Sequence, residues 1–172
     1  LGTLEAFNDC YTVLNLPYIM DSTEHYHEVM NDEEIIKPVY ESTKDSGFVG
    51  LTWFDAGVRN IYTTKKAIMK PEDLKGLKIR VQTSPTNVKM LEALGASPTP
   101  MSFGEVYTGL QQSVIDGAEN NELALINNKH GEVAKHYSYN MHAMLPDILV
   151  ASTNLLENKL TKHDKARSNL CF

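Results

Sequence analysis

The most constraining feature of the sequence is residues 74–121, where two strand-like and two helix-like segments alternate. In residues 77–81, three apolar residues alternate with Lys78 and Arg80, the period-two pattern of a half-buried strand. Arg80 therefore lies one residue before the end of the predicted strand. In open α/β sheets, ligands bind beyond the carboxyl ends of the strands, near the N–H groups that open the following helix. The position of Arg80 predicts the capture of an anion.

Both helices of this stretch have recognisable boundary residues. Thr83 or Ser84 can cap the first helix, and Gly95 is of the type that usually ends one. Ser102 and Glu105 have the spacing of a capping box for the second helix, and apolar residues follow at helical intervals. The stretch therefore predicts a β-α-β-α unit of an α/β fold.

The rest of the chain also alternates between helical and strand-like segments, and it contains no internal repeat. Asp21 and Glu24 fit a capping box ahead of a short helix, and Gly47 is a suitable stop for the next one. The break at residues 55–57 is the best candidate for a crossover between two lobes. We expect helices at residues 22–31, 32–47 and 155–168, and strands at residues 48–54, 58–64, 136–142 and 147–153.

Composition and charge exclude several classes of protein. With 42% hydrophobic and 22% charged residues, the 172-residue chain has the composition of a globular protein with one core or two small ones. The net charge of −6 argues against nucleic acid as a partner, because proteins that bind it carry a basic excess. No apolar run is long enough to cross a bilayer, and no signal peptide is visible in the sequence.

We expect neither a metal nor a cofactor. His25 and His27 are two residues apart on a predicted helix, so they point to nearly opposite sides and cannot chelate one ion. The other histidines follow no ligand pattern, and motifs for binding phosphate or dinucleotides are absent from the sequence. Cys10 and Cys171 lie near opposite ends of the chain and support a disulfide only weakly.

Arg59 and Arg80 are the main candidates for anion binding, because a guanidinium presents a planar fork of donors that matches a carboxylate. The alternative is a salt bridge at the surface, which is favoured for Arg59 and is as good as anion binding for Arg80. Residues 119–121 follow a turn predicted at residues 116–117, and their polar side chains either form that turn or bind a ligand. Phe103 belongs to an apolar stripe, so core packing is favoured over stacking on a ligand.

Three segments together resemble the middle of a TRAP-transporter solute-binding protein of the DctP type: residues 71–82 (PEDLKGLKIRVQ), residues 91–121, and residues 132–139 (EVAKHYSY). The resemblance covers most of residues 11–160. It implies a two-lobed α/β clamshell of the periplasmic-binding-protein kind, without enzymatic activity, that closes around a small organic acid. It also implies a periplasmic or cell-surface location and delivery of the acid to the permease subunits of a membrane transporter.

The resemblance further implies roles for individual residues. The arginine that makes the main salt bridge to the ligand carboxylate corresponds to Arg80. The other residues that it places in or beside the cleft are Arg59, Phe103 and Asn120, with Gln82 and Asn121 as neighbours. The segment from Gly117 onward is most similar to the uronate-binding branch, so glucuronate or galacturonate is the leading class of ligand.

We expect residues 1–56 and 146–172 to form part of the first lobe and residues 57–145 to form the second lobe, which carries most of the ligand contacts. The clamshell is expected to be incomplete in this chain, and the protein is expected to be a monomer. Two alternatives remain: a sensor domain that binds the same kind of organic acid, and a sugar-acid enzyme. The enzyme would need an acid/base pair, for which Glu119 and His142 are the candidates.

Overall fold

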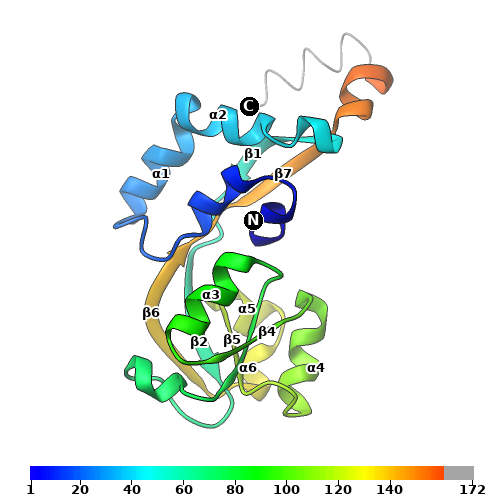
Figure 1. Ribbon diagram of the computed structural model, residues 1–172. Helices are drawn as coiled ribbons and strands as arrows, with labels where there is room; N and C mark the ends of the chain where they lie inside the picture. The colour runs from blue at the N-terminus through cyan, green and yellow to red at the C-terminus, as the bar shows by residue number, and fades with distance from the viewer. Residues whose placement is uncertain (161–172) are drawn as a thin grey trace.

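The computed structural model describes residues 1–160, which form two β-sheets joined by two chain crossings (Figure 1). One crossing lies at residues 55–57, between strands β1 (Phe48–Phe54) and β2 (Val58–Thr63). The other lies at residues 145–146, between β6 (His136–Met144) and β7 (Asp147–Ser152). Because β1 pairs with β7 and β2 pairs with β6, two paired segments pass together from one sheet to the other.

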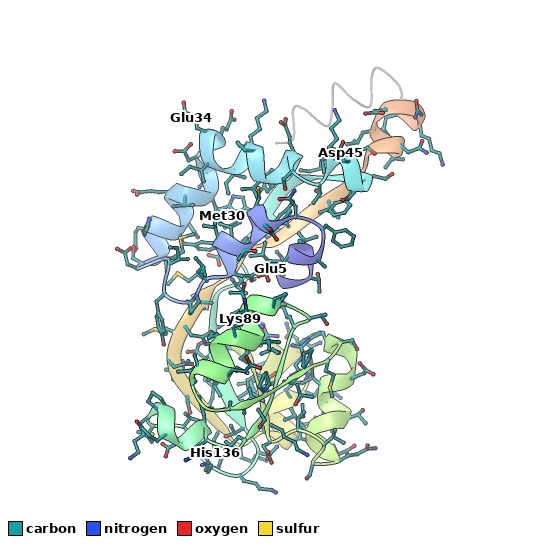
Figure 2. All side chains as sticks on the ribbon, viewed as in Figure 1. Glu5, Met30, Glu34, Asp45, Lys89 and His136 are labelled. Atoms are coloured by element: carbon teal, nitrogen blue, oxygen red, sulfur yellow. The ribbon has the colours of Figure 1, made fainter. Side chains whose placement is uncertain are left out.

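The smaller sheet, at the top of Figure 1, consists of β1 and β7 in antiparallel pairing. The helices α1 (Thr23–Asn31) and α2 (Glu33–Glu41) lie beside it. Its core contains Tyr26 and Met30 of α1, and Trp53 of β1 packs against that cluster. Figure 2 shows Met30 within this upper part of the molecule. Two short 3₁₀ helices precede it, η1 (Gly2–Ala6) and η2 (Asp9–Asn15).

The larger sheet has five strands in the order β4-β3-β5-β2-β6. Its remaining strands are β3 (Lys78–Val81), β4 (Ser97–Pro100) and β5 (Gly117–Asn120). Strand β3 is parallel to both of its neighbours, β4 and β5, whereas β2 is antiparallel to β5 and β6. The connecting helices are α3 (Pro85–Ala93), α4 (Val106–Gln111), α5 (Glu122–Asn127) and α6 (His130–Val133).

Hydrophobic clusters cover both faces of the larger sheet. On one face, Ile79 and Val81 of β3 pack with Leu91 of α3. On the other face, Tyr62 of β2 packs with Leu110 of α4. The parallel β3–α3–β4 unit confirms the α/β class expected from the sequence. Among the described residues, no helix is long and apolar enough to cross a membrane.

Most predicted elements are confirmed, and several helix boundaries are corrected. Ser84 caps α3, one of the two residues considered, and Ser102 with Glu105 forms the expected capping box. Asp21 does not cap α1: the Ser22 hydroxyl accepts from the His25 N–H, and the Asp21 carboxylate contacts the His25 ring at 2.8 Å instead.

The expected helix at residues 32–47 ends at Glu41, where the Ser42 hydroxyl donates to the Val39 carbonyl. A separate 3₁₀ turn, η3 (Lys44–Ser46), then ends at Gly47, whose φ is +90°. The predicted helix at residues 155–168 has one π-helical turn, Leu155–Lys159, and its residues beyond 160 lie outside the described part.

Gly117 does not form the predicted turn but begins β5, in the middle of the larger sheet. A Cβ added there would lie 2.5 Å from the Tyr62 carbonyl oxygen, so the strand requires glycine because of a close approach between backbones. We expect Gly117→Ala to lower the free energy of unfolding by about 1–3 kcal/mol. Urea unfolding of the purified protein measures this. Gly104→Ala, where nothing lies within 4 Å of the added Cβ, is the matched control; equal effects would contradict the explanation.

Candidate functional site

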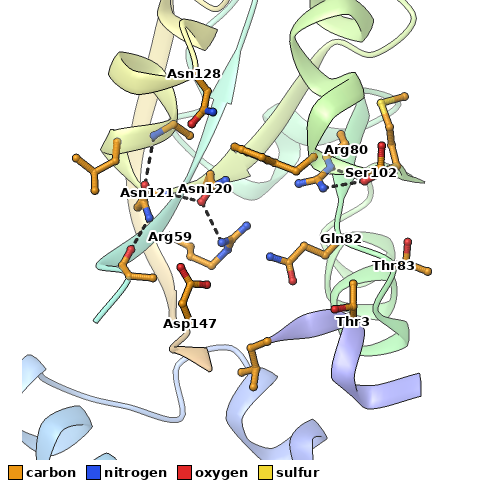
Figure 3. Close-up of a pocket in the computed structure, with 16 residues that line it drawn as sticks. Thr3, Arg59, Arg80, Gln82, Thr83, Ser102, Asn120, Asn121, Asn128 and Asp147 are labelled. Carbon is orange, nitrogen blue, oxygen red and sulfur yellow. Dashed lines mark hydrogen bonds between the residues drawn. The ribbon is translucent and has the colours of Figure 1, made fainter. Parts of the chain in front are cut away.

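A cavity of about 560 Å³ opens where the two sheets meet, and Figure 3 shows the side chains that surround it. Most of its wall comes from the carboxyl ends of β3 and β5 and from the loops that follow them. The rest comes from Arg59 of β2, from Ala56 at the crossing, from the segment after β4, from the first residue of β7 and from the N-terminal residues Leu1 and Thr3, so both parts of the molecule contribute. The lining residues are Leu1, Thr3, Ala56, Arg59, Arg80, Gln82, Thr83, Met101, Ser102, Phe103, Asn120, Asn121, Leu123, Ala124, Asn128 and Asp147.

All six residues that the sequence singled out as ligand contacts line this one cavity: Arg59, Arg80, Gln82, Phe103, Asn120 and Asn121. They come from strands and loops as far apart in the sequence as β2 and β5. The structure therefore brings the predicted residues together. Their roles in ligand binding stay predictions.

Arg80 has the donors best suited to receive a carboxylate. Its side chain is 3% exposed, and its Nε and Nη2 donate to the Met101 carbonyl at 2.9 and 2.7 Å. A guanidinium has five N–H donors, so three are left without a partner among the described residues: two on Nη1 and one on Nη2. One free donor on each terminal nitrogen is the arrangement that a bidentate carboxylate requires.

Most of the N–H donors of Arg59 are bound by other groups of the protein. Its Nε and Nη2 donate to the two carboxylate oxygens of Glu119 at 2.5 and 2.9 Å. Nη2 also donates to the Glu119 carbonyl, and Nη1 donates to the side-chain oxygen of Asn120 at 3.0 Å. These contacts occupy four of its five N–H donors. The salt bridge favoured for Arg59 is therefore present, but it is buried and not at the surface, because Arg59 is 5% exposed.

Glu119 is buried against Arg59, and His142 is buried against Glu119. Glu119 is 0% exposed, and its carboxylate lies 3.4 Å from Nε2 of His142. Burial alone would raise the pKa of Glu119, but the charge of Arg59 and hydrogen bonds from His142 and Arg59 lower it to about 2. Glu119 is thus held ionised and does not line the cavity. An acid/base role for this pair, which the enzyme alternative needs, does not fit this geometry.

Phe103 does not pack in the core, so the core packing favoured from the sequence is wrong. Its side chain is 41% exposed at the cavity, and its ring lies 5.9 Å from the Arg80 guanidinium carbon, within range of a cation–π contact. The ring also lies 5.4 Å from that of His130. The apolar period was misleading because Phe103 belongs to a 3₁₀ turn, Phe103–Glu105, that precedes α4.

The amide side chains combine structural contacts with unused donors. The Asn120 side-chain oxygen accepts from Arg59 and from the Asn121 N–H, while its Nδ2 has no acceptor among the described residues. The Asn121 oxygen caps α5 by accepting from the Ala124 N–H at 3.3 Å, and its Nδ2 donates to the Ala56 carbonyl. The Gln82 oxygen accepts from the Gly2 N–H at 3.0 Å.

The electrostatics of the cavity favour an anion near Arg80. Burial lowers the pKa of the Arg80 guanidinium, and the nearby charge of Arg59 lowers it further, against an opposing effect of Glu119. In contrast, the carboxylate of Glu119 outweighs burial and raises the pKa of Arg59. Because Glu119 is hydrogen-bonded to Arg59, the charge of Arg80 is the less compensated of the two. A carboxylate bound at Arg80 would balance it.

Asp147 also lines the cavity, although it is not among the ligand contacts expected from the sequence. The Pro146–Asp147 pair at the start of a predicted strand was the available signal. Two other histidines have local partners: His27 contacts Asp55 at 2.7 Å, and Nδ1 of His130 contacts the Tyr62 hydroxyl at 2.8 Å.

Within residues 1–160, no group of three histidine, cysteine or acidic side chains has an arrangement that could hold a metal ion. Cys10 is exposed and free. Its suggested partner, Cys171, lies outside the described residues.

An α/β protein with arginine donors directed into a cavity between two sheets has the features of a protein that binds small anions. The chain belongs to the DctP family, described as bacterial extracellular solute-binding protein, family 7, whose profile matches residues 1–167. The α/β fold and the resemblance stated from the sequence are thereby confirmed. Members of this family are transport receptors and not enzymes.

Two similar solved structures hold uronates. A TRAP periplasmic solute-binding protein from Anaerococcus prevotii, with bound D-glucuronate, is 56% identical with a TM-score of 0.96; the match covers 98% of this chain and 55% of that one. A counterpart from Xanthobacter autotrophicus, with bound β-D-galacturonate, is 39% identical with a TM-score of 0.92, covering 98% and 56%.

A more distant relative is named for a different kind of ligand. The C4-dicarboxylate-binding periplasmic protein of Vibrio cholerae is 33% identical over 156 residues, which is 89% of this chain and 46% of that protein. The chain spans about half the length of the curated relatives that it matches. Family membership alone therefore leaves the choice between uronates and dicarboxylates to the chemistry of the cavity.

Proposed function

We propose that this chain belongs to an extracytoplasmic solute-binding protein that captures a sugar acid, such as glucuronate or galacturonate, and delivers it to the permease of a TRAP-type transporter. The observation that carries this proposal is the set of three unused donors on Arg80, a residue that lines a cavity of about 560 Å³. The uronates bound by the two structural relatives support the class of ligand. The site would lie outside the cytoplasm, in the periplasm or at the cell surface.

The mechanism that we propose is closure of two lobes, residues 57–145 and the parts of the chain on either side. Arg80 lies on the larger sheet and Asp147 on the smaller one, so a ligand that contacts both walls would favour the closed arrangement. The two crossings at residues 55–57 and 145–146 are the places where such a movement would bend the chain. A sensor domain would share this pocket, and no feature of the cavity favours that alternative.

Thermal unfolding tests the ligand class directly. At a concentration of 100 times the dissociation constant, D-glucuronate or D-galacturonate is expected to raise the Tm of the purified protein by roughly 5–10 °C. D-glucose, which has the same ring without the carboxylate, is the matched control and should give little shift. Equal stabilisation by glucose and glucuronate would refute recognition through the carboxylate.

A further inference from the structure

Asp147 is the one carboxylate among the described residues that line the cavity. It is exposed, and no hydrogen bond or ion pair joins its side chain to another of the described residues. Figure 3 shows Asp147 beside Arg59, with Arg80 and Gln82 on the other side of the cavity. An unpaired carboxylate in a cavity that is otherwise suited to anions requires an explanation.

The backbone around Asp147 is held firmly. Asp147 is the first residue of β7 and pairs with Phe54 of β1, while Leu145 and Pro146 immediately before it are buried. The carboxylate is therefore presented from a strand, at the crossing between the two sheets. Groups carried on strands are positioned more precisely than groups on free loops.

The chemistry of the two walls is complementary. Arg80 supplies donors only, and an ionised Asp147 supplies acceptors only. A ligand that satisfies both must carry a carboxylate at one end and hydrogen-bond donors, such as hydroxyl groups, at the other. A second carboxylate in that place would face a like charge and would have no hydrogen to donate.

We infer that Asp147 is a specificity-determining residue that accepts hydrogen bonds from hydroxyl groups of a sugar monoacid and disfavours dicarboxylates. This inference rests on the proposed function and deepens it, because it names the chemical feature that separates two ligand classes found among the relatives. The buried Glu119 forms the direct ion pair with Arg59, and the charge of Asp147 has only a smaller effect on the pKa of that guanidinium.

The test is the affinity of wild-type protein and Asp147→Asn for D-glucuronate and for succinate, measured by calorimetric titration. Asparagine keeps the shape of the side chain but removes its charge. We expect the variant to bind D-glucuronate about 10- to 100-fold more weakly, because hydrogen bonds to a charged group are lost. Succinate is expected to bind more tightly to the variant than to the wild type, since the opposing charge is gone. A crossover with opposite signs for the two ligands is the supporting result.

Other results overturn the inference. If both ligands bind more tightly to Asp147→Asn, Asp147 acts only through long-range charge; if neither affinity changes, it does not contact the ligand. The variant should keep nearly the wild-type Tm without ligand, because the Asp147 side chain has no hydrogen bond or ion pair to lose among the described residues and its charge affects Arg59 less than that of Glu119. Asp45→Asn, an exposed aspartate on η3 away from the cavity, is the control and should change neither affinity.

A different binding result is expected if the proposed function itself is wrong. In that case wild-type protein would not bind D-glucuronate, or would bind it independently of Arg80, and both proposals would fall. Binding of D-glucuronate that depends on Arg80 but not on Asp147 would retain the proposed function and reject only this inference.

Discussion

Arg80→Ala is expected to weaken the binding of a uronate by at least about 100-fold. Two hydrogen bonds between a guanidinium and a carboxylate would be lost, and bonds to charged groups contribute about 1.5–3 kcal/mol each. Because Arg80 is 3% exposed, water and salt screen this interaction less than they would at the surface. Calorimetric titration of wild-type protein and variant with D-glucuronate measures the loss.

Arg80→Lys separates charge from geometry. Lysine retains the positive charge but lacks the planar fork, so we expect it to recover only part of the affinity. Both variants also remove the contacts with the Met101 carbonyl, so their Tm without ligand must be measured as the control for folding. An affinity of folded Arg80→Ala within about threefold of the wild type would exclude Arg80 as the main contact.

Glu119→Gln is expected to lower the free energy of unfolding by about 3–5 kcal/mol at pH 7, the usual cost of removing one partner from a buried ion pair. Glutamine has nearly the same shape, so the effect comes from leaving the Arg59 charge buried without its counter-charge. Urea unfolding at pH 7 measures it. Glu28→Gln, an exposed residue of α1, is the control and should change stability by less than about 0.5 kcal/mol.

The stability difference between the wild type and this variant is expected to depend on pH in a specific way. The pKa of Glu119 falls from its ordinary value of 4.5 to about 2 on folding, so the folded state favours the ionised carboxylate. Its contribution to stability is therefore full above about pH 4.5 and is lost as the pH falls toward 2. The difference between wild type and Glu119→Gln should be constant from pH 7 to 5 and should shrink below pH 4.5. A difference that grows on acidification would contradict the sign of this shift.

The two arginines of the cavity differ in how many of their N–H donors are bound within the protein. Arg59 uses four of its donors on Glu119 and Asn120, which fixes the Asn120 side chain at the cavity wall. Arg80 uses two donors on one carbonyl and retains three. The first arginine therefore orders the wall, and the second is available to a ligand. This is the physical basis for testing Arg80 first.

The sequence by itself determined the features that depend on near neighbours. The β3–α3 boundary and the capping box at Ser102 involve groups within a few residues of one another, so spacing and residue type were enough. For the cap of α3 they left Thr83 and Ser84 as alternatives, and the structure selects Ser84. The placement of Arg80 near the end of its strand followed from the same local pattern. The expectation that the six candidate residues lie in or beside one cleft came from the family resemblance, and the periodicity of the sequence did not provide it.

Only the tertiary structure decided what surrounds these residues. The Arg59–Glu119 ion pair joins residues 60 positions apart, and Asp147 reaches the cavity because β7 pairs with β1, which lies far earlier in the sequence. Phe103 faces the cavity because its turn precedes the helix, and Gly117 is required by the carbonyl of a neighbouring strand. Such contacts depend on strand order and on which strand ends come together, and local sequence patterns do not encode these distances.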